Sequence, residues 1–271
     1  MSRTKLWVVL AFVSLLAGAL VAAGCGGDDD NGGGETMEEG KLLVGTDTPF
    51  PPFEIGQPPD ISGYDIEVMN EIGMRLDLDV TYQDTSFDTI FRDTAQGKFD
   101  TAAAASTITE GRERTVDFTD PYYEAQQALV VTPGSDIKST DDLGGVVVGA
   151  QDATTGETYA NDETDASEVR GYPEGPDAIN ALRQGQVEAV IIDQPVAVDA
   201  EEKQGGIETA QEIATHELSG FALAQDNDTL REDMNGALQE MKDDGFIDQL
   251  YEKYFKTKPP KSVLEGTQEP T

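Results

Sequence analysis

Strand-like and helix-like segments alternate along residues 41–255, and this alternation constrains the fold more than any other feature. The apolar run at 41–46 predicts a strand. Apolar residues at spacings of three to four over 66–76 predict an amphipathic helix, and 78–83 predicts a second strand. A further helix and strand follow before residue 106. This rhythm predicts an α/β fold in which a mainly parallel sheet carries helices on both faces.

The same rhythm restarts in the second half of the chain, which indicates a second α/β unit and a cleft between two lobes. Two hinge strands are expected, around 129–132 and 220–224, so that both ends of the folded chain belong to the first lobe. Asp228 is expected to cap the long helix that follows. The predicted strands of this half are 128–134, 146–151, 187–193 and 220–225. The predicted division is lobe 1 at 41–131 with 222–257, and lobe 2 at 132–221.

The N-terminal segment predicts export. Arg3 and Lys5 precede a long apolar run that ends in small residues before Cys25, the only cysteine of the chain. This pattern is typical of a signal peptide, here 1–24, and it resembles the lipobox of bacterial lipoproteins, in which the cysteine is lipidated. The alternative is an uncleaved anchor helix that ends at a free cysteine. Residues 25–40 are rich in Gly, Asp and Glu and predict a flexible linker.

The other end of the chain is interrupted by prolines, and residues 258–271 are predicted to be a flexible tail. With 18 Lys and Arg against 53 Asp and Glu, the formal net charge is −35. Nucleic-acid binding needs a basic surface, so the charge argues against a nucleic-acid partner. It also argues against docking of the folded surface on anionic lipid.

Residues suited to catalysis are few. His216 is the only histidine, and it stands just before the second expected hinge strand. The spacings that zinc sites need are absent from the sequence, and so are the glycine-rich loops that bind phosphates. No metal or cofactor is expected, and the protein is not expected to be an enzyme.

Residues suited to binding a zwitterion are better represented. Arg112 follows a strand end and a run of hydroxyl residues, where a guanidinium can grip a carboxylate with two hydrogen bonds. Thr154 and Thr155 open a helix directly after a strand, which offers free backbone N–H groups to the same kind of anion. Asp193 ends an apolar strand and could accept an ammonium group, although it could instead cap the helix that begins near Pro195.

Three residues in the first half are expected at the cleft because they follow strands. Asp47 and Phe50 come after the first strand, and Phe87 comes after the second. Parallel sheets present ligands at the carboxyl ends of their strands. For the two aromatic residues, core packing is the alternative role.

Six sequence blocks, in order, resemble the solute-binding proteins of ABC importers, in the branch that binds polar amino acids. The blocks are VGTDTPFPPFE, SGYDIEVMNEI, STITEGRERTVDFTDPYYEA, VGAQDATTGE, VEAVIIDQPVA and MKDDGFIDQLYEKYF. The sequence departs from the family pattern at Gly111, where a larger residue is usual, and at Ala153, where glycine is usual. The resemblance implies two lobes of the periplasmic-binding-protein type.

The resemblance also implies the role of each site residue. Arg112 and Thr107 would bind the ligand carboxylate from lobe 1, and Thr155 would bind it from lobe 2. The carbonyl of Ala105 and the carboxylate of Asp193 would take the ammonium. The same family pattern places Phe50 and Phe87 on either side of the ligand side chain.

The expected function is therefore that of an extracytoplasmic lipoprotein, anchored through Cys25, that binds an amino acid and delivers it to an ABC transporter permease as a monomer. Asp47 lies at the expected cleft, and few cations besides Arg112 do, so a neutral polar or cationic side chain is favoured over an acidic one. Two alternatives stay open: an extracytoplasmic enzyme of the same fold that resembles a dehydratase, and a sensory receptor for amino acids.

Overall fold

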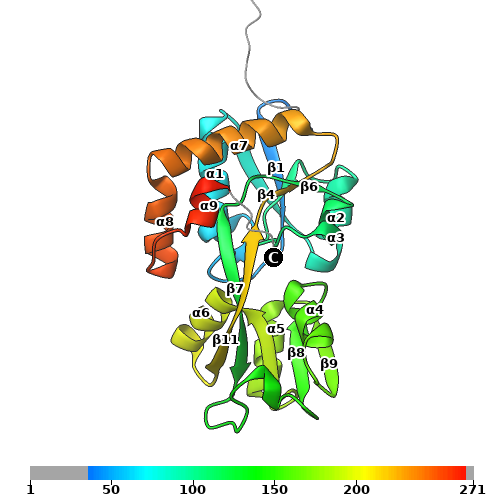
Figure 1. The fold of residues 1–271 in the computed structure, drawn as a ribbon. Coiled ribbons are helices and arrows are strands. Elements are labelled where there is room, and N and C mark those ends of the chain that lie inside the picture. Colours follow the sequence, from blue (N-terminus) through cyan, green and yellow to red (C-terminus); the bar gives the residue numbers. More distant parts are fainter. Residues whose placement is uncertain (1–35, 267–271) are drawn as a thin grey trace, which may run out of the picture. The chain divides into compact units, whose positions relative to one another are not determined.

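The computed structural model of the chain describes residues 36–266. The predicted signal peptide (1–24), the predicted lipidation residue Cys25 and most of the predicted linker (25–40) lie outside the described residues, as do residues 267–271. The described residues form two five-stranded sheets and one two-stranded sheet. Each five-stranded sheet is the centre of one lobe (Figure 1).

The sheet of lobe 1 has the strand order β4-β1-β5-β12-β6. β1 pairs in parallel with β4 and β5, as the alternation of strands and helices predicts. β12 enters from the C-terminal half of the chain and pairs antiparallel with β5 and β6. The strands of lobe 1, with its small β2-β3 hairpin, are β1 (Lys41–Thr46), β2 (Ile55–Gln57), β3 (Asp60–Ser62), β4 (Asp79–Asp84), β5 (Thr101–Ala102), β6 (Asp117–Phe118) and β12 (Ala222–Leu223).

The sheet of lobe 2 has the order β11-β7-β10-β8-β9. β8 pairs in parallel with β9 and β10, whereas β7 pairs antiparallel with β10 and β11. The predicted α/β class and the two lobes are confirmed, and both sheets are mixed. The strands of lobe 2 are β7 (Tyr123–Val131), β8 (Val147–Gln151), β9 (Glu168–Tyr172), β10 (Ala189–Asp193) and β11 (Glu208–Ser219).

Helices cover the sheets of both lobes (Figure 1). In lobe 1, α1 packs on β4 and α2 on β1, while α7 and α8 pack against α1. In lobe 2, α4 and α5 pack on β8, and α6 packs on β7. Among residues 36–266, no helix combines the length and the apolar character needed to cross a membrane. The helices are α1 (Tyr64–Arg75), α2 (Phe87–Ala95), α3 (Glu110–Glu113), η1 (Thr140–Asp142), α4 (Thr155–Asp162), α5 (Gly175–Arg183), α6 (Gln194–Gln204), α7 (Asp228–Asp243), α8 (Phe246–Phe255) and α9 (Lys261–Glu265).

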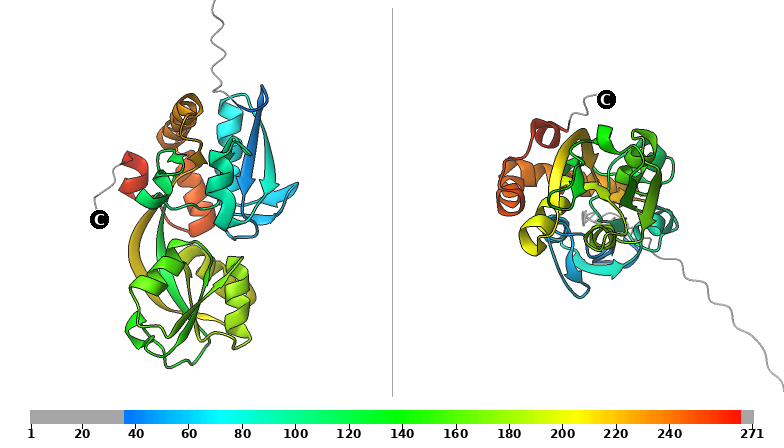
Figure 2. Two further views of the ribbon diagram at one scale, coloured as in Figure 1. Left: turned by 90° about the vertical axis from the view of Figure 1, so that its right-hand side faces the viewer. Right: turned by 90° about the horizontal axis from the view of Figure 1, so that it is seen from below.

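Two long strands, β7 and β11, run side by side between the lobes (Figures 1 and 2). Their pairing extends from Tyr123 opposite Ser219 to Val131 opposite Glu208, with a register shift between Ile213 and Glu217. The first crossing strand therefore begins earlier than the expected hinge at 129–132. The sequence analysis shortened it because the polar residues Glu124, Gln126 and Gln127 precede its apolar run. The second crossing strand is β11, which the sequence analysis missed by placing this hinge at 220–224.

Three smaller expectations also differ from the structure. The strand expected over 99–106 is reduced to β5, because Ala105 takes a φ of 45° and turns the chain out of the sheet. The cap of α7 is Asn227, whose side chain accepts from the backbone N–H of Leu230. The predicted tail contains α9, which is held because Val263 is fully buried and the Ser262 hydroxyl donates to Glu124.

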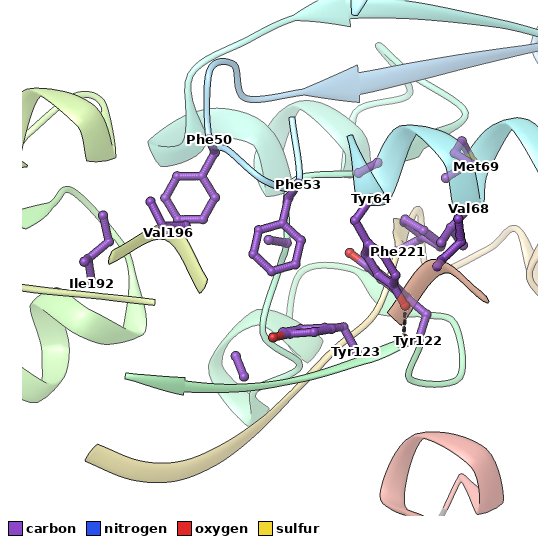
Figure 3. Packing of buried hydrophobic residues seen from close by; sticks show 14 of the residues in the cluster. Phe50, Phe53, Tyr64, Val68, Met69, Tyr122, Tyr123, Ile192, Val196 and Phe221 are labelled. Atoms are coloured by element: carbon purple, nitrogen blue, oxygen red, sulfur yellow. Dashed lines mark hydrogen bonds between the residues drawn. The ribbon is translucent and has the colours of Figure 1, made fainter. Parts of the chain in front are cut away.

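An aromatic core lies beside the cleft in lobe 1 (Figure 3). Tyr64, the first residue of α1, is fully buried, and its hydroxyl donates to the backbone carbonyl of Tyr122 at 2.8 Å. Phe53 packs edge-on against Tyr123 at a centroid distance of 5.0 Å. Phe50 extends from the same loop toward Val196 of lobe 2. The loop that carries Phe50 is thus fixed by packing against α1.

Gly63 permits this packing. Its φ of 132° and ψ of 178° lie in a backbone region that is essentially restricted to glycine. A Cβ at this position would lie 2.0 Å from the carbonyl oxygen of Phe53. The close approach of α1 to the loop therefore depends on the missing side chain.

We expect Gly63→Ala to lower the free energy of unfolding by at least ~2 kcal/mol, because it combines backbone strain with a clash against main-chain atoms. Urea unfolding of both proteins measures the difference. Gly97→Ala is the matched control, since Gly97 also has a positive φ, 68°, but nothing lies within 4 Å of its added Cβ. An equal loss in the two variants would show that the clash at Gly63 contributes nothing.

Candidate functional site

The structure brings all eight predicted ligand-binding residues together around one pocket between the lobes. Gln151, Thr154 and Ala104 complete its lining. The space among these residues is about 320 Å³, a figure that includes space open to solvent. The predicted residues that line it are Asp47, Phe50, Phe87, Ala105, Thr107, Arg112, Thr155 and Asp193. That they bind a ligand stays a prediction.

The strand ends explain why these residues meet. Asp47 follows β1, Ala105 follows β5 and Thr155 begins α4 directly after the turn from β8. Asp193 is the last residue of β10. Since β1 and β5 are parallel, as are β8 and β10, each lobe presents the carboxyl ends of its strands to the cleft.

Arg112 lies in α3, which Thr109 caps by accepting from the backbone N–H of Arg112. Its Nη1 donates to the carbonyl of Thr107 at 2.7 Å, and its Nη2 donates to the carbonyl of Ala153 at 3.2 Å. The guanidinium also lies over the Phe87 and Phe91 rings, with Cζ 5.1 and 4.7 Å from their centroids. These contacts fix its plane and connect the two lobes.

Burial lowers the pKa of Arg112 to about 10, opposed by the nearby carboxylates of Glu217 and Asp193, so the side chain stays protonated at neutral pH. The neighbouring Arg114 ends α3, is exposed and does not line the pocket. Ala153, the other family departure, has a φ of 62°. Gly111 is exposed, and a Cβ there would meet nothing closer than 3.7 Å.

Asp193 does not act as a helix cap, because its side chain makes no hydrogen bond to the first turn of α6. Instead its Oδ1 accepts from Nε2 of Gln127 at 2.6 Å. Burial raises the pKa of Asp193 to about 7, the carboxylate of Glu217 adds to the increase, and the Gln127 hydrogen bond and Arg112 oppose it. A cation beside Asp193 would therefore be strongly favoured.

Asp47 connects the lobes from the opposite side of the pocket. It is 2 % exposed, and its Oδ2 accepts from Nε2 of Gln151 at 2.7 Å. Burial raises the pKa of Asp47 to about 7, and the nearby charge of Asp84 contributes. Gln151 also donates to the carbonyl of Pro173, which holds it in lobe 2.

The aromatic residues both line the pocket and pack into the core. Phe50 is 8 % exposed and stacks on Phe53 at 6.2 Å, and Phe87 is 6 % exposed and meets Phe91 edge-on at 5.5 Å. A Cβ on Gly175 would lie 2.8 Å from the Phe50 ring, so lobe 2 leaves room for this ring. Phe50 and Phe87 thus combine a position at the cleft with packing in the core, which the sequence analysis treated as alternatives.

Ala105 is held by a buried network beneath the pocket. Its backbone N–H donates to Oδ2 of Asp65 at 2.8 Å, and the hydroxyl of Tyr122 donates to the same oxygen at 2.7 Å. Burial raises the pKa of Asp65 and that of the neighbouring Glu54. The network holds Ala105 in its left-handed conformation at the pocket wall.

Glu217 is a site residue that the sequence analysis missed. It lies in β11, and its Oε2 accepts from the hydroxyls of Thr107 at 2.8 Å and Thr155 at 2.5 Å. Both threonines were expected to donate to a ligand carboxylate, but their hydroxyls donate to this internal carboxylate. Gln127, which lies between Glu217 and Asp193, was also missed. Glu217 was missed because β11 was not recognised as a strand, and Gln127 was missed because it lies in the part of β7 that precedes the predicted strand 128–134.

His216 does not line the pocket. It occupies the irregular part of β11 with a φ of 50°, and its Nδ1 lies 2.9 Å from Oε1 of Glu124. Among residues 36–266, no group of His, Cys, Asp and Glu side chains is arranged to hold a metal ion. The described lining of the pocket combines one cation, Arg112, with the carboxylates of Asp47 and Asp193, and Glu217 accepts hydrogen bonds from two residues of the lining, Thr107 and Thr155. This set of charges suits a ligand with one anionic group and at least one cationic group.

Curated relatives cover almost the whole chain. The L-cystine-binding protein TcyJ of Escherichia coli strain K12 is 29% identical over 259 residues, which cover 94% of this chain and 96% of the relative. The ABC transporter glutamine-binding protein GlnH of Bacillus subtilis strain 168 is 29% identical over 268 residues, which cover 92% and 97%. Both relatives are binding proteins.

Solved structures share the fold. ArtJ of Geobacillus stearothermophilus, which binds arginine, lysine and histidine, has a TM-score of 0.78 at 29% identity, over 83% of this chain and 99% of ArtJ. An ancestral arginine-binding protein bound to glutamine gives 0.77 at 37% identity, over 81% and 100%. AncCDT-1, an ancestral amino acid-binding protein and a precursor of cyclohexadienyl dehydratase, gives 0.75 at 32% identity, over 80% and 96%.

The family assignment follows from the sequence match and the fold together. The family model of the bacterial extracellular solute-binding proteins, family 3, matches residues 42–257, which include both lobes and the whole pocket lining. The relatives above are amino acid-binding proteins, in agreement with the resemblance seen in the sequence. This chain belongs to the bacterial extracellular solute-binding proteins of family 3.

Proposed function

We propose that this protein captures one amino acid between its lobes, outside the cytoplasm, and delivers it to the permease of an ABC importer. One observation carries the proposal: the pocket sets a partly buried, oriented guanidinium, Arg112, against the carboxylate of Asp193. An α-amino acid is a zwitterion, and these two groups match its two charges. The amino acid ligands of the relatives support this class of substrate.

The α-carboxylate binds Arg112. A guanidinium has five N–H donors, and two hydrogen bonds to backbone carbonyls use only part of this set. Stacking on Phe87 and Phe91 keeps the remaining donors in a fixed plane, as two-bond recognition of a carboxylate requires. The N-terminus of α4 adds backbone N–H groups from lobe 2 at Thr155.

The ligand side chain lies toward Asp47, Phe50 and Phe87. Asp47 is a buried acceptor whose pKa of about 7 leaves it able to take a hydrogen bond from an amide or an ion pair from a cation. An acidic ligand side chain would bring a second anion close to the carboxylate of Asp47. The described lining contains no cation besides Arg112 that could pair with it. The ligand is therefore a neutral polar or cationic amino acid.

Ligand binding closes the lobes about β7 and β11. Three contacts already join the lobes in this structure: Asp47 to Gln151, Arg112 to Ala153, and Thr107 to Thr155 through Glu217. Hinge closure of this kind is established for periplasmic binding proteins as a class. A ligand that contacts both lobes stabilises the closed state over the open one, because only the closed state offers every contact.

We further infer that the mature protein is a monomer held at the membrane by a lipid on Cys25. The support is the sequence before this cysteine, Ala22-Ala23-Gly24, which follows a basic and then an apolar segment. A tether on an acidic linker would keep the folded unit near its permease without contact between the lipid surface and the fold.

The experiment is calorimetric titration of residues 26–271, refolded from denaturant to remove bound ligand, with each of the twenty amino acids. We expect binding at a single site per protein molecule. Arginine, lysine, histidine or glutamine should bind, whereas glutamate and aspartate should not. The bound amino acid should be recovered unchanged, which separates binding from a dehydratase-like activity. Tight binding of only acidic amino acids would contradict the assignment of Asp47 to the side chain.

Arg112→Ala should weaken binding by about two to three orders of magnitude, because loss of one partner of a buried ion pair costs roughly 3–5 kcal/mol. Arg112→Lys should restore only part of the affinity, since an ammonium lacks the planar fork. Arg114→Ala is the matched control and should change affinity less than about threefold. Calorimetry and a melting curve for each variant measure the outcome. Equal small effects at both arginines would show that the carboxylate site lies elsewhere.

Cys25→Ala should abolish lipid attachment, so that the protein is released or remains as an unprocessed precursor. Mass spectrometry of the mature chain and fractionation of cells into membrane and soluble parts give the readout. Mature protein of unchanged mass and unchanged membrane attachment in this variant would rule out the lipid anchor.

A further inference from the structure

Glu54 and Asp65 are two carboxyl residues in the core beneath the pocket, and the function proposed above uses neither of them. Both residues are fully buried, and their carboxyl groups hydrogen-bond each other. Oδ2 of Asp65 accepts from the backbone N–H of Ala105 at 2.8 Å and from the hydroxyl of Tyr122 at 2.7 Å. Oδ1 of Asp65 and both carboxyl oxygens of Glu54 receive no hydrogen bond from any other group of residues 36–266.

A single proton satisfies this pair. If both groups were ionised, two like charges would meet in the core and three carboxylate oxygens would lack a donor, which is costly. One proton between the two groups supplies a donor and leaves one negative charge. Asp65 is the better-stabilised anion because two donors already point at its Oδ2, whereas no such donor reaches Glu54. Glu54 is therefore the group better suited to hold the proton.

The charges around the pair favour the same assignment. The strongest charges that act on Glu54 are carboxylates: Asp65 of α1, Asp47 after β1 and Asp193 of β10. Burial first, and these charges after it, raise the pKa of Glu54 well above its ordinary value. Burial also raises the pKa of Asp65, but the hydrogen bonds that this group accepts oppose the increase. Burial raises the pKa of three tyrosines that interact with the pair, so they are neutral: Tyr64, Tyr82 and Tyr122.

The pair also connects two walls of the pocket. Two backbone hydrogen bonds join Glu54 to Phe50: the N–H of Phe50 donates to the carbonyl of Glu54 at 2.9 Å, and the N–H of Glu54 donates back at 3.2 Å. Asp65 holds the backbone N–H of Ala105. Phe50 and Ala105 both line the pocket. The hydrogen bond between the two carboxyl groups therefore joins the loop of Phe50 to the turn at Ala105.

We propose that Glu54 is a carboxylic acid in the folded protein, that it donates its proton to Asp65, and that this hydrogen bond positions the loop of Phe50 against the turn at Ala105. Neither member of the pair lines the pocket, so both act on a ligand only through Phe50 and Ala105. The positioning role rests on the proposed function, whereas the proton on Glu54 does not depend on it.

The proton determines how stability changes with pH. In the unfolded chain Glu54 has its ordinary pKa and loses its proton, whereas the folded chain keeps it. The free energy of unfolding therefore decreases as pH rises above about 5, until the pH reaches the pKa of the folded pair. Glu54→Gln has no such proton to lose, and its amide N–H can donate to Asp65 in place of the acid. The variant should lack this decrease.

Urea unfolding of residues 26–271 between about pH 5 and pH 8 measures the difference. Residues 32–271 form one compact unit, so this chain retains the whole fold. The unfolding constant of the wild type, divided by that of Glu54→Gln, should rise about tenfold per pH unit. Groups that titrate in both proteins contribute equally to the two constants. Glu202→Gln, at an exposed position of α6, is the matched control and should give a constant ratio. A constant ratio for Glu54→Gln would overturn the proposal.

Infrared spectroscopy tests the proton in the folded protein. A protonated carboxylic acid and a carboxylate absorb at different frequencies. The wild-type spectrum minus that of Glu54→Gln, at about pH 7, should contain the carbonyl band of a carboxylic acid. A carboxylate band in its place would show that Glu54 is ionised and would overturn the proposal.

Calorimetry tests the positioning role, with L-arginine, L-lysine, L-histidine and L-glutamine as the probes. Glu54→Met keeps the length of the side chain but leaves Asp65 without its donor, and it should weaken binding about tenfold or more. Glu54→Gln should stay within about threefold of the wild type. Melting curves show whether each variant is folded. Equal affinities of the two variants would overturn the positioning role. A wild type that binds none of the twenty amino acids would overturn the proposed function, while the unfolding and infrared results would still decide where the proton lies.

Discussion

The pocket between the lobes contains an unbalanced set of buried and partly buried charges, and the rest of the structure is arranged around it. Arg112 is the one cation in the described lining, Asp47 and Asp193 supply two carboxylates, and Glu217 lies next to the lining, where it accepts from Thr107 and Thr155. Buried charge is costly unless it is paired, and the raised pKa values of Asp47 and Asp193 show that cost. A zwitterion with a cationic or amide side chain would relieve it.

The two strands that cross between the lobes lie beside this charge. β7 carries Gln127 and β11 carries Glu217, so two polar groups next to the pocket lining belong to the crossing strands. The remaining groups come from strand ends and loops of the separate lobes. A change in the angle between the lobes must therefore change the distances between Glu217 and the two threonines.

The sequence predicted the part of the site that follows from local rules. Asp47, Thr155 and Asp193 were found because residues after parallel strands gather at one edge of a sheet, and Arg112 was found because cations are scarce in this chain. Glu217 and Gln127 were not found. They lie 90 residues apart and meet only because β7 and β11 pair antiparallel. Nothing near either residue in the sequence marks that pairing.

The sequence by itself determined the α/β alternation, the two lobes and the residue types that face the cleft, because strand and helix periodicity and strand-end chemistry are local properties. Only the tertiary structure decided the roles of the threonine hydroxyls. A hydroxyl can donate or accept, and its role depends on the group opposite it. For Thr107 and Thr155 that group is Glu217, which the fold brings from a distant strand. The direction of these hydrogen bonds is therefore a property of the folded chain.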